Sequence, residues 1–374
     1  MNFGFTEEQD LLRSEVRKFL DENCPLETVR KITEDPNGGG FSRDLWQHIA
    51  DLGWLGLTLP ELHGGAGLGF VDLVVVLEET GRSLFPSPLV SHTLAAHAIR
   101  RFGSAKQHSR WLPRLVDGSA IGTVALAEED AAPGPEGVRL AGRSAGKQLT
   151  LTGEKWFVGD AAAADLIVVA FRKGKSQELG LAVVERGAEG LAARDLPGID
   201  LTKRLGRVAL DRVKLARDAV LPKGNAAAIA HLFDVGALAV TAEGVGAAEA
   251  ALRLTAGYAK QRVQFGRPIG SFQAVKHPLA EAYVDVQSFQ SLVYYAAWCA
   301  DHGRKDLPLA VSRAKAYASE ALPRIGIDAI QLHGGIGYTW EYDAQLFLKR
   351  AKWLRAAFGD ADWHYERVAA LGGL

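Results

Sequence analysis

At 374 residues and 40.2 kDa, the chain is long enough for two or three domains of roughly 150 residues each. Apolar residues make up 48% and charged residues 23%, a composition that argues against a disordered chain and a coiled coil. The 43 basic and 44 acidic side chains leave a net charge of -1, which argues against a nucleic-acid-binding protein. With only Cys24 and Cys299, the chain has no disulfide scaffold and no cysteine-rich metal site, so we expect free thiols and no bound metal.

The first residues are acidic, and no uninterrupted apolar run approaches the ~18 residues of a membrane span. We therefore expect no signal peptide, no transit peptide and no membrane span. The expected localisation is cytoplasmic.

Residues 1–120 are predicted to be helical. Thr6 and Gln9 form a capping-box pattern ahead of a helical apolar periodicity, and Ser42 can cap a second helix. Helical patterns also cover residues 73–80, 89–101 and 105–115.

Between residues 121 and 222 the pattern changes to short β-type runs. These runs cover residues 148–152, 166–171, 179–184 and 208–215. Residues 223–374 are again helical, with proline expected only at helix boundaries, at Pro268, Pro278, Pro308 and Pro323. Blocks of helices, strands and helices predict an α+β fold with domains at 1–120, 121–222 and 223–374, not an alternating doubly wound sheet.

Glycines and histidines inside helical runs have plain structural interpretations. Gly244 and Gly246 fall short of a dinucleotide fingerprint and follow no strand, so we expect them to allow close helix packing. His92 and His97 are out of phase with a metal-binding pair on one helix face.

Three glycine-containing segments carry more information. In residues 60–69, Gly64, Gly65, Gly67 and Gly69 fit either a tight surface loop or a ligand loop. In residues 262–273, Gly266 and Pro268 enforce a turn. The turn presents Arg262 and Arg267 beside Phe265, a combination suited to pairing with phosphate and stacking on a ring. A charged helix end is the alternative.

The third segment covers residues 331–342. Gly334 and Gly335 can expose backbone amides to a phosphate or a flat ring beside Gln331, and a bare helix C-cap is the alternative. In this order and spacing, the three segments resemble the acyl-CoA dehydrogenase family over nearly the whole chain. The shared motifs include Arg-x-x-Phe-Gly-x-Pro-Ile at residues 262–269 and Gln-x-x-Gly-Gly-x-Gly-Tyr-Thr at residues 331–339.

The resemblance implies an N-terminal helical domain, a central β-domain and a C-terminal four-helix bundle. It also implies FAD as the cofactor, an acyl-CoA thioester as the substrate and an electron-transfer flavoprotein as the electron acceptor. By resemblance, the residues that contact FAD are Arg262, Gln264, Phe265, Phe272, Gln273, Gln331, Gly334 and Gly335.

The family's catalytic base is missing. Family members remove the α-proton of the thioester with a Glu at one of two positions, which in this chain are occupied by Phe358 and Gly236. Asp234 and Asp360 lie two residues away, where the side-chain direction differs, so neither is expected to substitute. The catalytic residue is therefore unknown.

The central domain also departs from the family. The family's flavin-covering Trp-Ile-Thr aligns with Phe157, Val158 and Gly159, and the Thr of its Thr-Glu-Pro segment aligns with Ala127. In homotetrameric relatives these β-domain residues hold the flavin of their own subunit, whereas the Arg-Phe-Gly and Gln-Gly-Gly segments reach the flavin of a neighbour. The chain thus keeps the half of the site that acts across a subunit boundary.

Three hypotheses follow. In the first, the chain is a subunit of a heterotetrameric acyl-CoA dehydrogenase, completes a related subunit's FAD site and is inactive alone. The second is a self-sufficient flavoenzyme that assembles with copies of itself and has an unrecognised base or different chemistry. The third is a non-catalytic scaffold subunit. The acyl chain length is not encoded in any recognisable motif.

Overall fold

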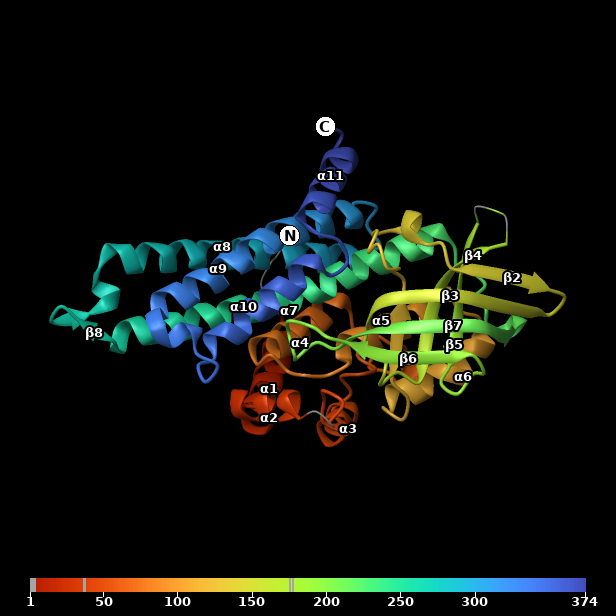
Figure 1. Cartoon of the computed structure of the whole chain (residues 1–374), viewed down its shortest axis with the longest axis horizontal. Coiled ribbons are helices and arrows are strands. Elements are labelled where there is room, and N and C mark those ends of the chain that lie inside the picture. The colour runs from red at the N-terminus through yellow and green to blue at the C-terminus, as the bar shows by residue number, and fades with distance from the viewer. Residues whose placement is uncertain (1–4, 36–37, 175, 177) are drawn as a thin grey trace. The chain divides into compact units, whose positions relative to one another are not determined.

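The computed structural model describes residues 5–35, 38–174, 176 and 178–374. Its elements follow the predicted order of helices, strands and helices, which confirms the α+β fold class (Figure 1). The N-terminal helices are α1 (Glu7–Asn23), α2 (Leu26–Glu34), α3 (Arg43–Asp51), α4 (Phe70–Arg82), α5 (Leu89–Phe102) and α6 (Ala105–Val116). The central strands are β1 (Gly122–Ala125), β2 (Ala141–Ala145), β3 (Gln148–Gly159), β4 (Leu166–Lys173), β5 (Leu179–Glu185), β6 (Leu191–Leu196) and β7 (Leu205–Ala216). The C-terminal elements are α7 (Ala226–Gln261), β8 (Val263–Gln264), β9 (Arg267–Pro268), α8 (Gln273–Asp301), α9 (Leu307–His333), α10 (Ala344–Ala356) and α11 (Ala361–Gly372).

The residues form two compact units. The helical unit comprises Met1–Lys31, Phe70–Phe85 and Ala237–Leu374, and the sheet unit comprises Ile32–Gly69 and Pro86–Gly236. Helix α4 thus belongs with the C-terminal helices, while α5 and α6 belong with the strands. The domain boundaries at residues 120 and 222 stay predictions.

The sheet unit is built on a seven-stranded sheet of order β1-β4-β2-β3-β7-β6, with β5 paired to β4. The four predicted β-type runs are confirmed as the cores of β3, β4, β5 and β7. Strands β1, β2 and β6 were not predicted. β1 is only four residues long, and most residues of β2 and all of β6 lack burial, so neither shows an apolar run or a clear alternation.

The predicted helix starts are confirmed by their capping bonds. The amide of Gln9 donates to Thr6 Oγ1 at 3.3 Å, and the amide of Thr6 donates to Gln9 Oε1 at 3.1 Å, which completes the capping box of α1. The amide of Leu45 donates to Ser42 Oγ at 3.3 Å at the start of α3.

The prediction that proline lies only at helix boundaries is wrong for two residues. Pro278 lies inside α8 and Pro323 inside α9. Proline removes a backbone hydrogen bond from a helix interior, but α9 continues through Pro323, which is buried beside Ala321 and Leu322. Tertiary packing here outweighs the local preference.

The glycine-rich segment at residues 60–69 is a tight surface loop that folds on itself. The amides of Gly65, Ala66 and Gly67 donate to the carbonyls of Pro60, Gly56 and Leu59 at 3.1, 3.0 and 2.8 Å. Because these amides are already paired within the loop, they are not free to cradle a phosphate. The structure therefore favours the surface-loop interpretation.

Helices α4 and α7 pack backbone to backbone in the helical unit, as predicted for the glycines of α7. A Cβ atom at Gly246 would lie 1.8 Å from the carbonyl oxygen of Glu78, and a Cβ atom at Gly81 would lie 1.9 Å from that of Glu243. Only glycine permits this approach. Gly244 likewise faces the side chain of Leu354, at 2.7 Å from its Cβ position.

By length and composition, α7 could also cross a membrane, and in the part of the chain that the structure describes it is the one helix that could. However, 89% of its most apolar window is buried inside the folded chain, as in the core helix of a folded protein. Cys24 and Cys299 are free and buried, and burial raises the pKa of both thiols, that of Cys24 to about 12.

The α4–α7 contact predicts a sharp difference between two glycines of the same helix. Gly246→Ala should destabilise the protein by about 1–3 kcal/mol or more, because the new methyl group collides with the backbone of α4. Gly257→Ala is the matched control: its Cβ position has no atom within 4 Å, so the protein should gain up to about 1 kcal/mol from a better helix former. Chemical denaturation of both variants measures this, and equal effects would contradict the packing argument.

Candidate functional site

The β8–β9 hairpin directly follows α7 and presents the first predicted site residues. Its two strands pair Val263 with Pro268 and Gln264 with Arg267. The turn residues Phe265 and Gly266 have φ of 50° and 77°, which is the pattern of a tight hairpin turn with glycine in its second position. Phe265 is 92% exposed, so the hairpin displays an aromatic ring at its tip.

Polar side chains on this hairpin are also exposed. Arg262 and Gln264 lie in the exposed stretch, and Gln273 begins α8 just beyond it. Among the described residues, none forms an ion pair or a hydrogen bond with the guanidinium group of Arg262. The guanidinium of Arg267 instead lies over the ring of Phe272, 4.1 Å from its centroid. The hairpin thus offers one cation for a partner and uses the other internally.

The glycine turn at the end of α9 carries the remaining predicted residues. Gln331 is exposed in the last turn of α9, and Gly334 leaves the helix with a φ of 66°. The Cβ positions of Gly334 and Gly335 have no atom within 4 Å, so the backbone is open there. Gly337 differs, since a Cβ atom there would lie 2.5 Å from the carbonyl oxygen of Ile330. The first two glycines therefore leave room for a ligand, and the third serves packing.

An aromatic cluster brings the hairpin and the glycine turn to the same end of the helical unit, where β8 lies in Figure 1. The ring centroid of His333 lies 4.5 Å from that of Tyr258 and 4.7 Å from that of Tyr342. Tyr258 lies one helical turn before Arg262, whose amide donates to its carbonyl at 2.8 Å. Sequence reasoning assigned no role to these rings, although the spacing of Tyr258 from Arg262 was a usable signal.

His333 is held in one tautomer within this cluster. Its Nδ1 donates to the carbonyl of Ala329 at 2.6 Å, which leaves the lone pair on Nε2. Burial lowers the pKa of His333, although this backbone bond opposes the shift. The ring is therefore neutral at pH 7 and acts as a packing element between α7 and α9.

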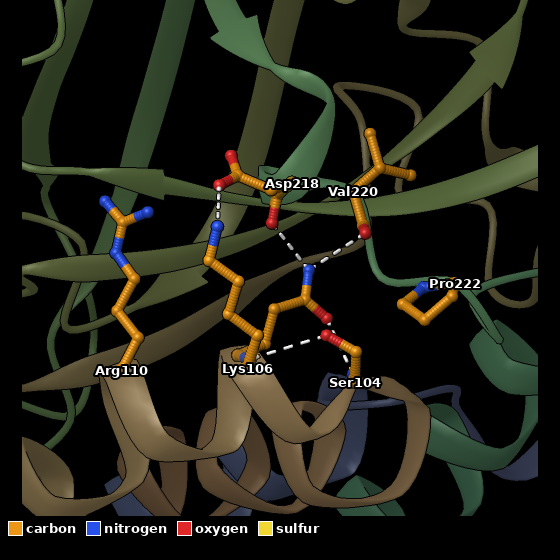
Figure 2. Close-up of a pocket in the computed structure, with 7 residues that line it drawn as sticks. Ser104, Lys106, Arg110, Asp218, Val220 and Pro222 are labelled. Atoms are coloured by element: carbon orange, nitrogen blue, oxygen red, sulfur yellow. Dashed lines mark hydrogen bonds and ion pairs between the residues drawn. The ribbon is translucent and has the colours of Figure 1, made fainter.

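A separate small pocket lies in the sheet unit, between the start of α6 and the segment that follows β7 (Figure 2). Its volume is about 170 Å³. Lys106 pairs with Asp218 at 3.2 Å, and Gln107 donates to the carbonyls of Asp218 and Val220 at 2.7 and 2.9 Å. It is smaller than ordinary ligand pockets of roughly 300–1,000 Å³, and these polar groups are already paired.

Buried histidines in the sheet unit do not form a metal site. His97 Nε2 lies 2.9 Å from His231 Nε2, and burial, reinforced by nearby positive charge, lowers the pKa of both rings, that of His231 to about 4. No three His, Cys, Asp or Glu side chains of the described ranges gather to hold a metal ion.

Comparison with known proteins identifies the fold and the motifs. Residues 6–119 match the acyl-CoA dehydrogenase N-terminal domain, and residues 223–371 match the C-terminal domain of the same family. Acyl-CoA dehydrogenase IpdE2 of Mycolicibacterium smegmatis is 34% identical over 92% of this chain and 93% of its own length. The chain belongs to the acyl-CoA dehydrogenase family. Acyl-CoA dehydrogenases are FAD-dependent oxidoreductases that act on CH–CH donors.

Two solved structures share the fold. The chain is 30% identical to a chain of the ChsE4-ChsE5 complex from Mycobacterium tuberculosis, with a TM-score of 0.91 over 100% of this chain and 99% of that chain. It is 33% identical to a chain in a variant of the Tcur3481-Tcur3483 steroid ACAD, with a TM-score of 0.88 over 98% of each chain. The resemblance drawn from the motifs is confirmed.

The two positions at which the motif alignment expects the acyl-CoA dehydrogenase base lie on different elements. Phe358 is half-buried in the loop between α10 and α11, and Gly236 is buried inside α7. Asp360 caps α11, where its carboxylate accepts a bond from the amide of Trp363 at 2.9 Å. Asp234 is buried in the sheet unit, with 3% of its surface exposed.

Gly159, which the sequence resemblance aligns with the family's flavin-binding Thr, has little free space beside it. A Cβ atom at Gly159 would lie 2.6 Å from Ser91 Oγ. The Ser91 hydroxyl in turn donates to the carboxylate of Asp160, and Thr123 Oγ1 donates to the carbonyl of Gly159 at 2.6 Å. The missing hydroxyl is thus more than a lost side chain, because the space beside Gly159 is filled from α5.

A neighbouring ion pair is preserved in the same β-domain segment. Lys155 is fully buried and donates to Glu128 Oε1 and to the carbonyl of Leu126, both at 2.9 Å. Burial lowers the pKa of Lys155 to about 8, and the Glu128 carboxylate opposes the shift.

Beyond this pair, Phe157 has a φ of 55° and is 45% exposed at a register shift of β3. The aligned aromatic position is therefore still presented at the surface of the sheet unit.

The closure at Gly159 predicts coupling between two substitutions. Gly159→Ala should destabilise the protein by about 1–3 kcal/mol, because its methyl group collides with Ser91 Oγ. In a Ser91→Ala background, the same substitution should be less destabilising by at least about 0.5 kcal/mol. Denaturant unfolding of the four proteins in this cycle tests the closure, and strictly additive effects would contradict it.

Proposed function

We propose that this chain is one subunit of a heteromeric acyl-CoA dehydrogenase and that it completes the FAD site of a related partner chain. FAD supplies the hydride acceptor for α,β-dehydrogenation of an acyl-CoA thioester. One observation carries the proposal. The chain keeps the exposed residues that, by resemblance, reach the flavin of a neighbouring subunit, but it lacks the hydroxyls that hold a subunit's own flavin, because Gly159 and Ala127 stand in their places.

The kept residues fit a dinucleotide by their chemistry. Arg262 offers a guanidinium that no residue described by the structure pairs with, which suits the FAD diphosphate. Phe265 and Phe272 offer aromatic faces, and the open backbone at Gly334 and Gly335 allows close approach. The amide side chains of the hairpin and the glycine turn add polar contacts, from Gln264, Gln273 and Gln331.

The heteromeric assignment is supported by the missing base. Neither Phe358 nor Gly236 can accept a proton, and the carboxylate of Asp360 is engaged as a helix cap. One similar structure is a complex of two differently named chains, ChsE4 and ChsE5. A partner that supplies its own base and β-domain would leave this chain the task of closing the flavin site across the interface.

The remaining parts of the proposal concern substrate, electron acceptor and localisation. A similar chain belongs to a steroid ACAD, so acyl-CoA thioesters of steroid side chains belong in any substrate panel beside simple fatty acyl-CoA thioesters. The proposed electron acceptor is an electron-transfer flavoprotein. The proposed compartment is the cytoplasm, in keeping with two buried free thiols.

Arg262 provides the direct test of the flavin contact. In a complex coexpressed with a partner, Arg262→Ala should weaken FAD retention about tenfold or more, because a charge-assisted bond to phosphate contributes roughly 1.5–3 kcal/mol. Arg253→Ala is the matched control, since Arg253 is an exposed arginine of α7, the helix that ends just before Arg262, and pairs with Glu249 at 2.5 Å. Flavin absorbance after dialysis measures retention. Unchanged occupancy in the Arg262 variant would overturn the proposed contact.

Phe358 provides the test of the missing base. The chain alone should not dehydrogenate acyl-CoA thioesters at a family rate, because general-base assistance is commonly worth about 10²–10⁴-fold. Phe358→Glu should not restore the reaction in the isolated chain, because Gly159 and Ala127 still leave the flavin half incomplete. Anaerobic flavin bleaching with and without the partner measures both. Rapid bleaching by the unmodified chain alone would favour a self-sufficient enzyme, and a chain that never affects flavin binding or turnover would favour a scaffold.

A further inference from the structure

A fully buried lysine lies beneath the loop that carries Phe358. Lys315 of α9 has none of its surface exposed, and its ammonium nitrogen contacts three oxygen atoms. The acceptors are Ser319 Oγ at 2.8 Å, the carbonyl of Arg355 at 3.2 Å and the carbonyl of Gly359 at 2.8 Å. An ammonium group has three N–H bonds, so each one has an acceptor. The charged form of Lys315 can therefore satisfy all three acceptors at once.

A second buried side chain holds the neighbouring carbonyl. His364 of α11 is fully buried, and its Nε2 lies 3.1 Å from the carbonyl oxygen of Phe358. The proton must be on Nε2, because the carbonyl can only accept. Among the described residues, none forms a hydrogen bond with Nδ1 of this ring. Burial, with the positive charge of Lys315 nearby, lowers the pKa of His364 to about 3, so the ring stays neutral.

The two carbonyls belong to consecutive residues in an uncommon backbone conformation. Phe358 has a φ of 57° and Gly359 a φ of 99°. A bulky residue disfavours the left-handed region, so this conformation needs support from its surroundings. A Cβ atom at Gly359 would also lie 2.4 Å from the ring of Trp363, which leaves only glycine at that position. Lys315 and His364 supply bonds from two different helices to this strained pair.

We propose that Lys315 and His364 are positioning residues, a clamp that fixes the backbone of Phe358 and Gly359 and thereby the direction of the side chain at position 358. The placement of that side chain at the acyl thioester rests on the proposed function, whereas the clamp itself rests only on the contacts above. The same clamp would orient a carboxylate at this position as well as it orients Phe358, because it holds main-chain oxygens.

The clamp is expected to respond to pH through Lys315. Burial lowers the pKa of Lys315 to about 7, and the negative charge of Asp360 opposes the shift. Above this pKa the amine has two N–H bonds for three acceptors, so one acceptor loses its bond as the pH rises. His364 titrates far below this range. The other charged group that acts on the clamp is Arg367 of α11, whose charge also lowers the pKa of His364. The Glu320–Tyr365 pair joins α9 to α11 beside it.

A fluorine probe at position 358 tests the clamp directly. We would replace Phe358 by 4-fluorophenylalanine in the full chain and follow its ¹⁹F resonance from pH 5.5 to 9. The resonance should shift with a midpoint near 7, and the shift should vanish in Lys315→Met. A probe at Phe265, which is 92% exposed in the same unit, is the control and should show no such midpoint. A resonance at 358 that does not titrate, or that titrates unchanged in Lys315→Met, overturns the proposal.

If Lys315→Met fails to fold, a variant that changes only a nearby charge tests whether Lys315 causes the pH response at position 358. Asp360→Asn keeps an acceptor for the helix cap and removes the negative charge that favours the ammonium form. The midpoint at position 358 should fall by about 0.2–0.7 pH unit, as expected for an exposed charge. An unmoved midpoint overturns the assignment to Lys315.

The same probe separates the clamp from the proposed function. Adding butyryl-CoA or a steroid acyl-CoA to the complex with its partner should shift the resonance at position 358. A probe at Phe19 of α1, outside the proposed flavin site, is the control for this step and should be less affected. Titration without any response to thioester would support the clamp and overturn the placement of Phe358 at the acyl site. A resonance that responds to thioester but does not titrate would support the placement of Phe358 at the acyl site and overturn the clamp.

Discussion

The helical unit depends on the backbone contact between α4 and α7. At Gly81 and Gly246 the two helices approach so closely that no Cβ atom fits between them. This approach removes the carboxylates of Glu78 and Glu79 from water, with 1% of each residue exposed. Because buried carboxylates need partners, α1 and α8 are drawn against α4 by charged and polar side chains. The residues that supply these bonds are Arg13, Arg17, Gln290 and Tyr294.

The packing of α7 against α4 also helps to position the residues that are candidates to contact the flavin. Held against α4 along its middle, α7 runs on to the aromatic cluster of Tyr258, His333 and Tyr342. That cluster ties its last turns to the end of α9, so Arg262 and the glycine turn are positioned by packing and not by bonds to each other. Such an arrangement leaves the polar groups of the hairpin available, which a site assembled across a subunit boundary requires.

How far the sequence predicts this structure depends on how local each feature is. The cap at Thr6, the runs that become β4 and β5, and the packing glycines of α7 all follow from short-range patterns, and all were predicted. The exposed edge strand β6 has no such pattern, and the course of α9 through Pro323 is decided by burial in the tertiary fold. Motifs also named the hairpin and the glycine turn. They could not reveal that Ser91 fills the space beside Gly159, because those residues meet only in the folded sheet unit.

The two departures from the family differ in kind. At position 358, a side chain is already present and the loop is held through main-chain oxygens, so exchanging Phe for Glu asks for no new backbone conformation. At position 159, any side chain meets the hydroxyl of Ser91, which is itself bonded to Asp160, so a Thr there requires Ser91 to move and that bond to break. The base is therefore the simpler of the two features to regain by substitution, and the flavin half the harder one. A chain that had lost only its base would be one substitution from an acyl-CoA dehydrogenase of its own, whereas the filled space at Gly159 is the feature on which the proposed dependence on a partner's flavin rests more firmly.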